Sequence, residues 1–583
     1  MIYRMLINVS LLFILLSSSP LSLLKSVDCY GVMSIDFGSE WMKVGLVAPS
    51  VQMDLVLNAQ SERKTPMAIA VSNGERFIGD SALNVAIKFP ERTYTYFLDL
   101  VGKKLEDEPV QQYQRRFPYI DISSHEPNSS SIILNHPQDL TFTPLELVAM
   151  MIEHAHDQVV ARLGTNEPVS DVVITVPPYF NAVEKKVIQD AARIVGLNVL
   201  RFTNSNSAFA LSYGIFRHKD YLPELNENKT SILFFDQGAS HTSVTLADYH
   251  LVEQLDPITR DKLNESIPTV TIRAQVYDRF LGGLEMQLRL RDHFVQAFSK
   301  ETKIDVERVY KRGRSASKVW KEAGRVKRVL SANSEYLVQI ENVIDDKDLK
   351  YHMTRQMYEN INEDLLNARV TKLLDKLFET PNVSRKERLE SVIIVGGNTR
   401  TPKIQQVLQD YFKLEQLGKS VNADEGAVLA ALYQAASLGR GFRVKRFNLE
   451  EFGEEKIRYD PAKVIVTTTT PAPVTEPPTE APVTLEEVTA STEEGATTTP
   501  APIPETTTTT TPKPTAVITG PPPTPDPNSI YSDAELERIS KRLAKMKEDD
   551  FARLQQAALQ NSLELSEIEK ERGENKEEVK DEL

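Results

Sequence analysis

Two short segments of the chain each place an aspartate and a glycine where an apolar strand turns back on itself. Residues 32–47 and 231–246 both read as an apolar run, an Asp-x-Gly sequence and a second apolar run. The paired residues, 200 positions apart, are Asp36 and Gly38 in the first segment and Asp236 and Gly238 in the second. Glycine lets backbone N–H groups approach phosphate oxygens, and a carboxylate at a strand end can hold the waters of a Mg²⁺ ion. One such turn is also typical of an ordinary hairpin, but the repetition predicts two related lobes that close on one nucleotide.

The elements that must position these turns alternate between strand and helix patterns, which predicts an α/β architecture. A third apolar run, IIVGG at 393–397, ends in two further glycines. The best-marked helix spans 144–163, and its capping residues are Thr143, Pro144, Glu146 and Gly164. Other patterns predict a strand at 172–176 and helices at 181–195, 299–330 and 354–377.

Several of these segments resemble the phosphate and adenosine motifs of the actin-like ATPase fold, as used by the seventy-kilodalton heat-shock chaperones. The matching segments are 172–197 (crossover between lobes), 327–331 (adenosine-gripping helix) and 391–425 (last segment of the first lobe). The sequences GSEWMKV at 38–44 and LGGLEM at 281–286 resemble the large lumenal branch of that family. The resemblance covers residues 30–447 and implies a two-lobed actin-like ATPase domain made of duplicated ribonuclease-H-like halves.

The resemblance also implies which residues would hold ATP or ADP together with Mg²⁺. The phosphates would be faced by Asp36, Gly38, Ser39, Glu40, Asp236, Gly238, Ala239 and Ser240. The adenosine would be contacted by Lys327, Arg328 and Ser331, and an arginine can stack its guanidinium plane on a purine. The base pocket would be completed by Gly396, Gly397, Asn398, Arg400 and Asp424. The metal would be held through Asp36 and Asp236.

The groups that this family uses for hydrolysis are missing from the corresponding positions. The active-site lysine of the family is replaced by Leu98, and the crossover glutamate by Ser205. In the second hairpin, the threonine and second aspartate of the family are replaced by His241 and Ser243. A lysine beside the γ-phosphate neutralises developing charge, which leucine cannot do. We therefore expect nucleotide binding with weak or absent hydrolysis, and we interpret His241 as a bystander rather than a substitute base.

Both ends of the chain carry targeting patterns. An apolar run at 5–16 follows Arg4 and is too short to span a membrane, which predicts a signal peptide over 1–29. The last four residues form the receptor-read signal for return to the endoplasmic reticulum; they are Lys580, Asp581, Glu582 and Leu583. Together these patterns predict residence in the lumen of that compartment. Sequons for glycosylation stand at Asn128, Asn228, Asn264 and Asn382.

Net charge and cysteine content exclude some classes of partner and one source of stability. The formal net charge of −14 gives no reason to expect binding to nucleic acid or to an anionic membrane. Cys29 is the only cysteine, so no internal disulfide can form and packing alone must hold the core.

Composition changes sharply after the mid-450s. Residues 448–529 are rich in threonine and proline, which predicts a disordered linker. Residues 530–583 form an acidic tail, where a capping box at 532–535 opens a helix with an apolar face. We interpret that helix as marginally stable rather than as a dedicated interaction helix. The β-sandwich that holds unfolded peptide in the family is not recognisable after residue 447, so we expect a shortened form.

The favoured interpretation is a lumenal chaperone component that binds ATP and serves as a nucleotide-exchange co-chaperone in folding, stress response and the unfolded protein response. Its partners would be the conventional lumenal heat-shock chaperone (the immunoglobulin-binding protein), the retrieval receptor and unfolded proteins. One alternative is a microsomal chaperone that consists only of an ATPase domain and hydrolyses slowly. An actin-fold small-molecule kinase is disfavoured because its base aspartate and sugar loop cannot be identified. A nucleotide-free scaffold is disfavoured by the retained aspartates and glycine turns.

Overall fold

The computed structural model describes residues 31–451 and 531–556, apart from 125–131, 165–167, 226–228, 256–261, 382, 385–388, 440 and 554. These residues belong to one unit of the chain, and a second unit, 469–525, lies outside them. Several predicted features also lie outside the described residues: the signal peptide, the linker from 452 onward, the retention residues Lys580–Leu583, and the sequons Asn128, Asn228 and Asn382. Asn264 lies in strand β15.

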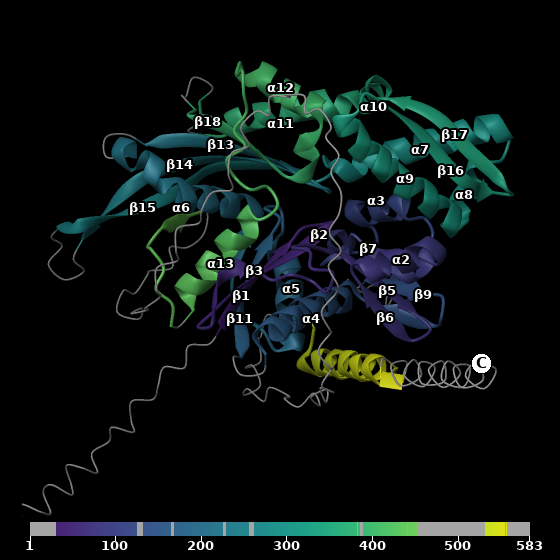
Figure 1. Ribbon diagram of the computed structural model, residues 1–583, viewed down its shortest axis with the longest axis horizontal. Helices are drawn as coiled ribbons and strands as arrows, with labels where there is room; N and C mark the ends of the chain where they lie inside the picture. Colours follow the sequence, from purple (N-terminus) through teal and green to yellow (C-terminus); the bar gives the residue numbers. More distant parts are fainter. Residues whose placement is uncertain are drawn as a thin grey trace, which may run out of the picture. The chain divides into compact units, whose positions relative to one another are not determined.

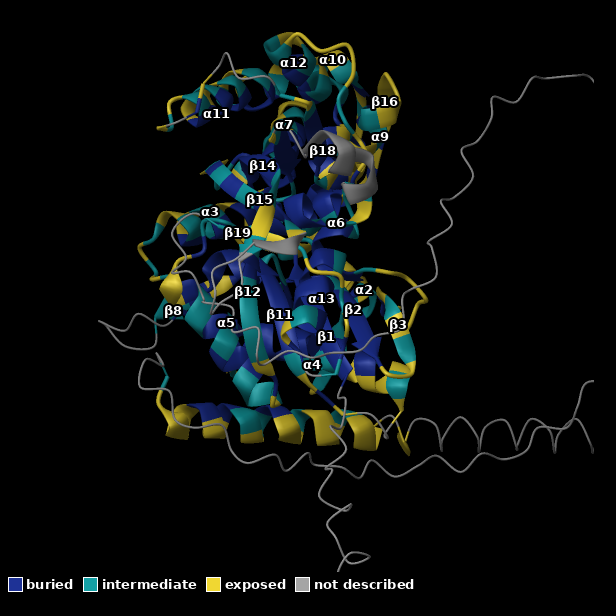
Figure 2. Cartoon of the chain, turned by 90° about the vertical axis from the view of Figure 1, so that its left-hand side faces the viewer, coloured by how far each residue is buried: buried dark blue, intermediate teal, exposed yellow. Residues whose placement is uncertain are grey.

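The first lobe is built on a six-stranded sheet in the order β12-β11-β1-β2-β3, with β4 paired to β2. Its strands are β1 (Gly31–Phe37), β2 (Trp41–Ala48), β3 (Val51–Leu55), β4 (Thr65–Pro66), β11 (Val169–Val176) and β12 (Asn198–Asn204). The helices nearest this sheet are α4 (Pro144–Leu163), α5 (Ala182–Val195) and α13 (Gly426–Leu438). Every residue of β1 is buried, as expected for a central strand covered on both faces (Figure 2).

Smaller elements extend the first lobe beside this sheet. One three-stranded sheet contains β5 (Ala68–Ser72), β6 (Glu75–Ile78) and β7 (Thr93–Thr95). A second contains β8 (Asp121–Ser124), β9 (Ile132–His136) and β10 (Leu140–Phe142). The accompanying helices are α2 (Asp80–Lys88) and α3 (Glu108–Arg116), with 3₁₀ turns at Pro90–Arg92 and Phe97–Leu100.

The second lobe is built on a five-stranded sheet in the order β18-β13-β14-β15-β19 (Figure 1). Its strands are β13 (Thr230–Gln237), β14 (Thr242–Leu255), β15 (Lys262–Asp278), β18 (Ser391–Val395) and β19 (Asn448–Glu450). The helices of this part are α6 (Ser205–Leu225), α11 (Arg369–Phe378) and α12 (Pro402–Phe412), with a π-helical turn at Asp364–Ala368 and a 3₁₀ turn at Gly397–Arg400. Its outer part contains α7 (Gly283–Thr302), α8 (Val306–Lys311), α9 (Gly313–Ala332), β16 (Glu335–Ile344), β17 (Lys347–Thr354) and α10 (Arg355–Ile361).

The two central sheets repeat one local topology. Strand β1 pairs antiparallel with β2 and parallel with β11, while β13 pairs antiparallel with β14 and parallel with β18. The cross-strand partner of Asp36 is Lys43, and that of Asp236 is Ser243. The α/β fold and the duplicated hairpin predicted from the sequence are therefore confirmed. The assignment of the whole segment 391–425 to the first lobe was wrong, because β18 pairs with β13 and α12 packs in the core of the second lobe.

Helix ends follow the local signals closely, whereas two long predicted helices are interrupted. The helix predicted over 354–377 is divided into α10, the π-helical turn and α11, with a break at Asn362. Thr143 and Glu146 form a reciprocal capping box at the start of α4, and Gly164 follows its last residue. The helix predicted over 299–330 was wrong as a single element, because α7 ends at Thr302, Lys303 follows with a left-handed backbone, and α9 begins only at Gly313. The basic composition of that stretch gave no sign of either break.

A helix over residues 533–553, called the tail helix, packs against the first lobe (Figure 1, yellow). Its apolar residues Leu536, Ile539 and Leu543 are buried in the core cluster that also contains much of α4 and the first-lobe sheet. The predicted apolar face is thus present, but the expectation of a marginal, solvated helix is not met.

Polar contacts fix the orientation of the tail helix. Arg542 Nη1 lies 2.9 Å from Glu146 Oε1, and its other nitrogen donates to the carbonyl of Thr141. Asp550 accepts from Arg76 at 2.8 Å, and Lys547 contacts Asp157 at 2.8 Å. Within the described part of the chain, no helix is long and apolar enough to cross a membrane.

Candidate nucleotide-binding site

The turns of the two duplicated hairpins meet at the junction of the lobes. In each turn the glycine N–H donates to the carbonyl three residues on, at 3.1 Å from Gly38 to Trp41 and 3.1 Å from Gly238 to His241. Ser39 Oγ and Ser240 Oγ lie 2.7 Å apart across the junction. Two of the residues predicted to face the phosphates, which lie far apart in sequence, therefore come together in one place.

Asp36 at the end of β1 already has two partners. The ammonium of Lys43 lies 2.8 Å from Asp36 Oδ2, and Thr175 Oγ donates to the other carboxylate oxygen. Burial lowers the pKa of Lys43, but the charge and hydrogen bond of Asp36, with the nearby charges of Asp424 and Asp236, outweigh burial and raise it overall. Lys43 is therefore a charged group at the phosphate end. We did not predict it, although hairpin register alone places it opposite Asp36.

Asp236 at the end of β13 has a different environment. Burial, followed by the negative charge of Asp36, raises the pKa of Asp236 to about 7, and the charge of Lys43 opposes this rise. Gly396, with φ of 85°, packs directly against this carboxylate, since a Cβ there would lie 2.5 Å from Asp236 Oδ1. A side chain at Gly396 would be strained both by backbone conformation and by lack of space.

Residues predicted to contact the adenosine form a second cluster around the start of α7. Lys327 Nζ donates to the carbonyl of Gly283 at 2.9 Å. A Cβ at Gly283 would lie 2.8 Å from that Nζ and 2.9 Å from Asn398 Oδ1, so three segments converge here. The pKa of Lys327 is lowered overall, because burial outweighs the opposing charge of Glu40 in the first lobe. Sequence reasoning placed Lys327, Asn398 and Glu40 in the site but missed Gly283.

The remaining predicted residues lie around these two clusters. Arg400 Nη2 lies 3.3 Å from Asp424 Oδ2, and Lys64 contacts the same carboxylate at 3.8 Å. Ser331 Oγ donates to the carbonyl of Arg328 at 2.7 Å, within their own helix. The carbonyl of Ala239 accepts from Leu284 N. A Cβ at Gly397 would have no neighbour within 4 Å, so this position is open.

The positions where the family keeps its reactive groups are occupied by residues engaged elsewhere. Leu98 is buried in the core of the first lobe. Ser243 donates to Asn206 Oδ1 at 2.7 Å. Burial, with the charge of Arg279, lowers the pKa of His241 to about 4, so this imidazole is neutral at pH 7 and a weak base.

The described residues offer no complete ligand set for a magnesium ion, so an ion here would depend on Asp36, Asp236, water and the nucleotide phosphates. Within the described ranges, no group of three or more His, Cys, Asp or Glu side chains could hold a metal. Mg²⁺ demands near-octahedral oxygen ligation, usually through carboxylates, water and substrate phosphate. Of the two predicted ligands, Asp36 is neutralised by Lys43. The arrangement therefore supports phosphate binding better than direct metal binding.

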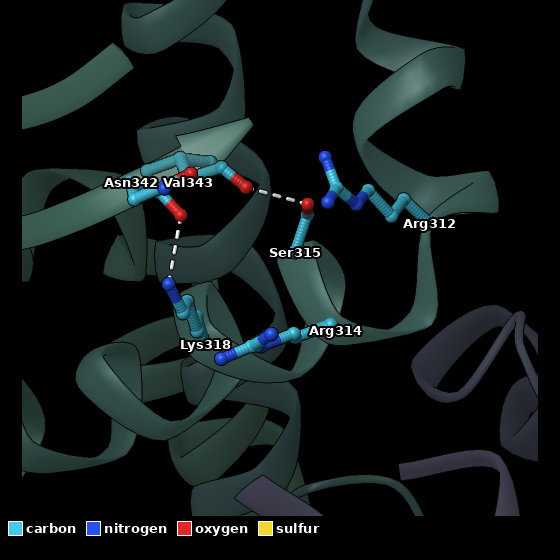
Figure 3. A pocket seen from close by; sticks show the side chains of 6 residues that line it. All are labelled: Arg312, Arg314, Ser315, Lys318, Asn342 and Val343. Carbon is cyan, nitrogen blue, oxygen red and sulfur yellow. Dashed lines mark hydrogen bonds between the residues drawn. The ribbon is translucent and has the colours of Figure 1, made fainter. Parts of the chain in front are cut away.

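A separate pocket lies in the outer part of the second lobe (Figure 3). Its lining residues are Arg312, Arg314, Ser315, Lys318, Asn342 and Val343. Lys318 Nζ donates to the carbonyl of Asn342 at 2.7 Å. Burial, then the charges of Arg314 and Arg312, lower the pKa of Lys318. None of these residues belongs to the predicted nucleotide site.

Comparison with known proteins agrees with this arrangement. The family model for Hsp70 protein matches residues 32–455. The chain belongs to the Hsp70 family. The Hsp70 chaperones bind nucleotide with Mg²⁺ and interact with unfolded protein clients, and the α/β fold described above is the ATPase domain of that family.

Among curated relatives, the chain is similar to Hypoxia up-regulated protein 1 of several vertebrates. It is 41% identical to the Xenopus tropicalis protein over 428 residues, which is 73% of this chain and 64% of that protein. It is 41% identical to the Xenopus laevis protein over 436 residues, with 75% and 64% covered. It is 40% identical to the human protein over 426 residues, with 73% and 41% covered. The matched part thus spans less than two thirds of these relatives.

Proposed function

We propose that this chain is an ATP- and ADP-binding Hsp70-family component of the endoplasmic reticulum lumen that works through shape rather than turnover. ATP closes the two lobes, and the closed form grips the ATPase domain of the conventional lumenal chaperone and releases its ADP. The observation that carries this proposal is the meeting of both hairpin turns at the 2.7 Å contact between Ser39 and Ser240, while the hydrolytic positions are filled by unreactive residues.

Nucleotide binding is supported by the hydrogen-bond donors that lie along the junction of the two lobes. The N–H groups of Gly38 and Gly238 close their own turns, so phosphates would meet the backbone N–H groups of the residues that follow each glycine, and Lys43 adds a positive charge beside them. Further along, Lys327, Gly283 and Asn398 close one wall by direct contact. Such binding favours the closed lobes only by the difference in affinity between closed and open forms, and a partner can sense that difference.

Weak hydrolysis is supported by the fate of the catalytic positions. Leu98 lies in the core and Ser243 is held by Asn206, so neither can stabilise charge on a transferring phosphate. Loss of one preorganised electrostatic group costs about 2.7–4 kcal/mol of transition-state stabilisation. Loss of several such groups leaves binding without useful turnover.

Calorimetry of ATP and ADP binding to the full chain tests the first half of this proposal. Gly397→Glu should abolish binding, because the position has room for a side chain that would put bulk and a negative charge into the predicted base pocket beside Gly396. Gln356→Glu adds the same charge on the exposed surface of α10 and should bind as wild type. Equal affinity of all three proteins, or brisk single-turnover hydrolysis, would contradict the proposal.

Stopped-flow release of labelled ADP from the conventional lumenal chaperone tests the second half. The chain preloaded with ATP should accelerate release, and Gly397→Glu should not. An unchanged release rate at saturating protein would show that the exchange role is wrong even if nucleotide binds.

The proposed location rests on the signal pattern at 1–29 and on the terminal tetrapeptide. Removal of Lys580–Leu583 should send the protein into the medium with at least one glycan. Continued retention of the truncated protein would contradict this part of the proposal.

A further inference from the structure

Among the residues that the structure describes, Lys43 brings a positive charge to the phosphate end of the site. Lys43 Nζ lies 2.8 Å from Asp36 Oδ2, and the two side chains are only 13% and 8% exposed. The same nitrogen lies 3.8 Å from the position that a Cβ would take at Gly38, which places it beside the phosphate-facing turn. A buried ammonium at this point is a direct candidate for contact with an anionic ligand.

Hairpin register explains why the cation appears in one lobe only. Lys43 is the cross-strand partner of Asp36, whereas the equivalent partner of Asp236 is Ser243. Ser243 donates its hydroxyl to Asn206 and brings no charge. The two otherwise matched hairpins therefore contribute two carboxylates and a single ammonium to the junction.

We infer that Lys43 is the resident cation of the nucleotide site, so that it contacts the terminal phosphates of ATP or ADP and makes binding largely independent of divalent metal. This inference rests on the proposed nucleotide binding and adds the nature of the counter-charge. It agrees with the pairing of Asp36, one of the two predicted magnesium ligands, with the ammonium of Lys43.

A purely structural role for Lys43 makes a different prediction. If the ammonium only compensated Asp36 inside the hairpin, its removal would lower stability and leave metal-free nucleotide affinity unchanged in the folded fraction. A charge-assisted contact to phosphate instead appears directly in the affinity measured without metal. The two roles are therefore separated by binding data on folded protein.

The test is calorimetry of ADP binding to the full chain in EDTA and in excess Mg²⁺. Wild type should lose less than about 10-fold in affinity when the metal is removed. Lys43→Met should lose about 10–100-fold in EDTA and recover most of this with Mg²⁺, while Lys43→Arg keeps metal-free binding. Circular dichroism on each protein checks folding.

The double variant Lys43→Met with Asp36→Asn guards against misfolding, because it leaves no buried unpaired charge. It should also lose metal-free affinity, as Lys43→Met alone does. Binding by wild type only with Mg²⁺, or equal metal-free affinity of Lys43→Met and wild type, would overturn the inference and leave the proposed function standing. Failure of wild type to bind nucleotide in both buffers would overturn both.

Discussion

The two lobes share one hairpin design but differ in what faces its aspartate. In the first lobe, Asp36 is paired with Lys43 at 2.8 Å; in the second, the partner of Asp236 is the uncharged Ser243. The pKa of Asp236 consequently rises to about 7 through burial and the charge of Asp36. Among the described residues, only the first lobe is covered by the tail helix. The two hairpins therefore share one backbone geometry, while the side chain opposite each aspartate gives each lobe a different charge.

Removal of residues 531–583 should have the largest effect and should act on the first lobe. Burial of Leu536, Ile539 and Leu543 contributes to its core, so we expect a loss of roughly 3–6 kcal/mol in unfolding free energy. Urea unfolding measures this loss of unfolding free energy for the whole protein. Hydrogen exchange should rise in α4 and α5 and stay unchanged in β13. Removal of 557–583 alone is the control and should have no effect, and equal stability of both truncations would contradict the prediction.

Asp236→Asn should remove a pH dependence that comes from the second lobe. The folded pKa of about 7 exceeds the ordinary carboxyl value of 3.8, so the folded state binds more protons between these values. Unfolding free energy of the nucleotide-free protein should therefore fall as pH rises from about 4 to about 7. Asp236→Asn should flatten this slope and stabilise the protein at pH 8 by roughly 2–4 kcal/mol.

Thermal denaturation at several pH values measures this effect. Asp36→Asn is the matched change in the first lobe and should not stabilise the protein, because it removes the partner of Lys43. Equal stabilisation by both substitutions would show that the two aspartates are equivalent despite their different cross-strand partners.

Alanine substitutions at the two turn glycines should reveal a smaller difference in stability between the two lobes. A Cβ at Gly38 would lie 2.7 Å from the backbone carbonyl of Trp41, while a Cβ at Gly238 would have no neighbour within 4 Å. Gly38→Ala should therefore cost about 1–3 kcal/mol of stability, since the turn itself must shift. Gly238→Ala should stay within about 0.5 kcal/mol of wild type. Urea midpoints decide, and the reverse order would contradict the structure.

Arg542→Met should have the smallest effect. Arg542 is partly exposed, but it contacts Glu146, whose side chain is only 4% exposed and is also part of the α4 capping box. We expect a loss of about 1 kcal/mol after allowance for solvent screening. Lys541→Met, on the exposed side of the same helix, should change nothing measurable by urea unfolding. Equal effects of the two substitutions would show that the contact with Glu146 is unimportant.

Local signals predicted much of this fold, and long-range pairing accounts for the rest. The capping box of Thr143 and Glu146 and the two hairpins depend on residues close in sequence, so they were accessible from it. The helical spacing of the apolar residues from Leu536 onward predicted an apolar face, but it did not predict which surface that face covers. Lys43 was missed although the register of a local hairpin places it opposite Asp36; its environment could not be predicted, because the second lobe contributes the charge of Asp236. The convergence of Gly283 with Asn398 likewise depends on packing between distant segments.

The tail helix is joined to the last strand of the second lobe through residues 452–530, so its docking is an intramolecular event. A disordered linker of about 80 residues, as predicted from the sequence, would correspond to an effective concentration of roughly 0.1–1 mM. A free helix of equal intrinsic affinity would have to reach that concentration to displace half of the tail. Even a modest intrinsic affinity therefore keeps this face of the first lobe occupied and closed to soluble competitors present at micromolar concentrations.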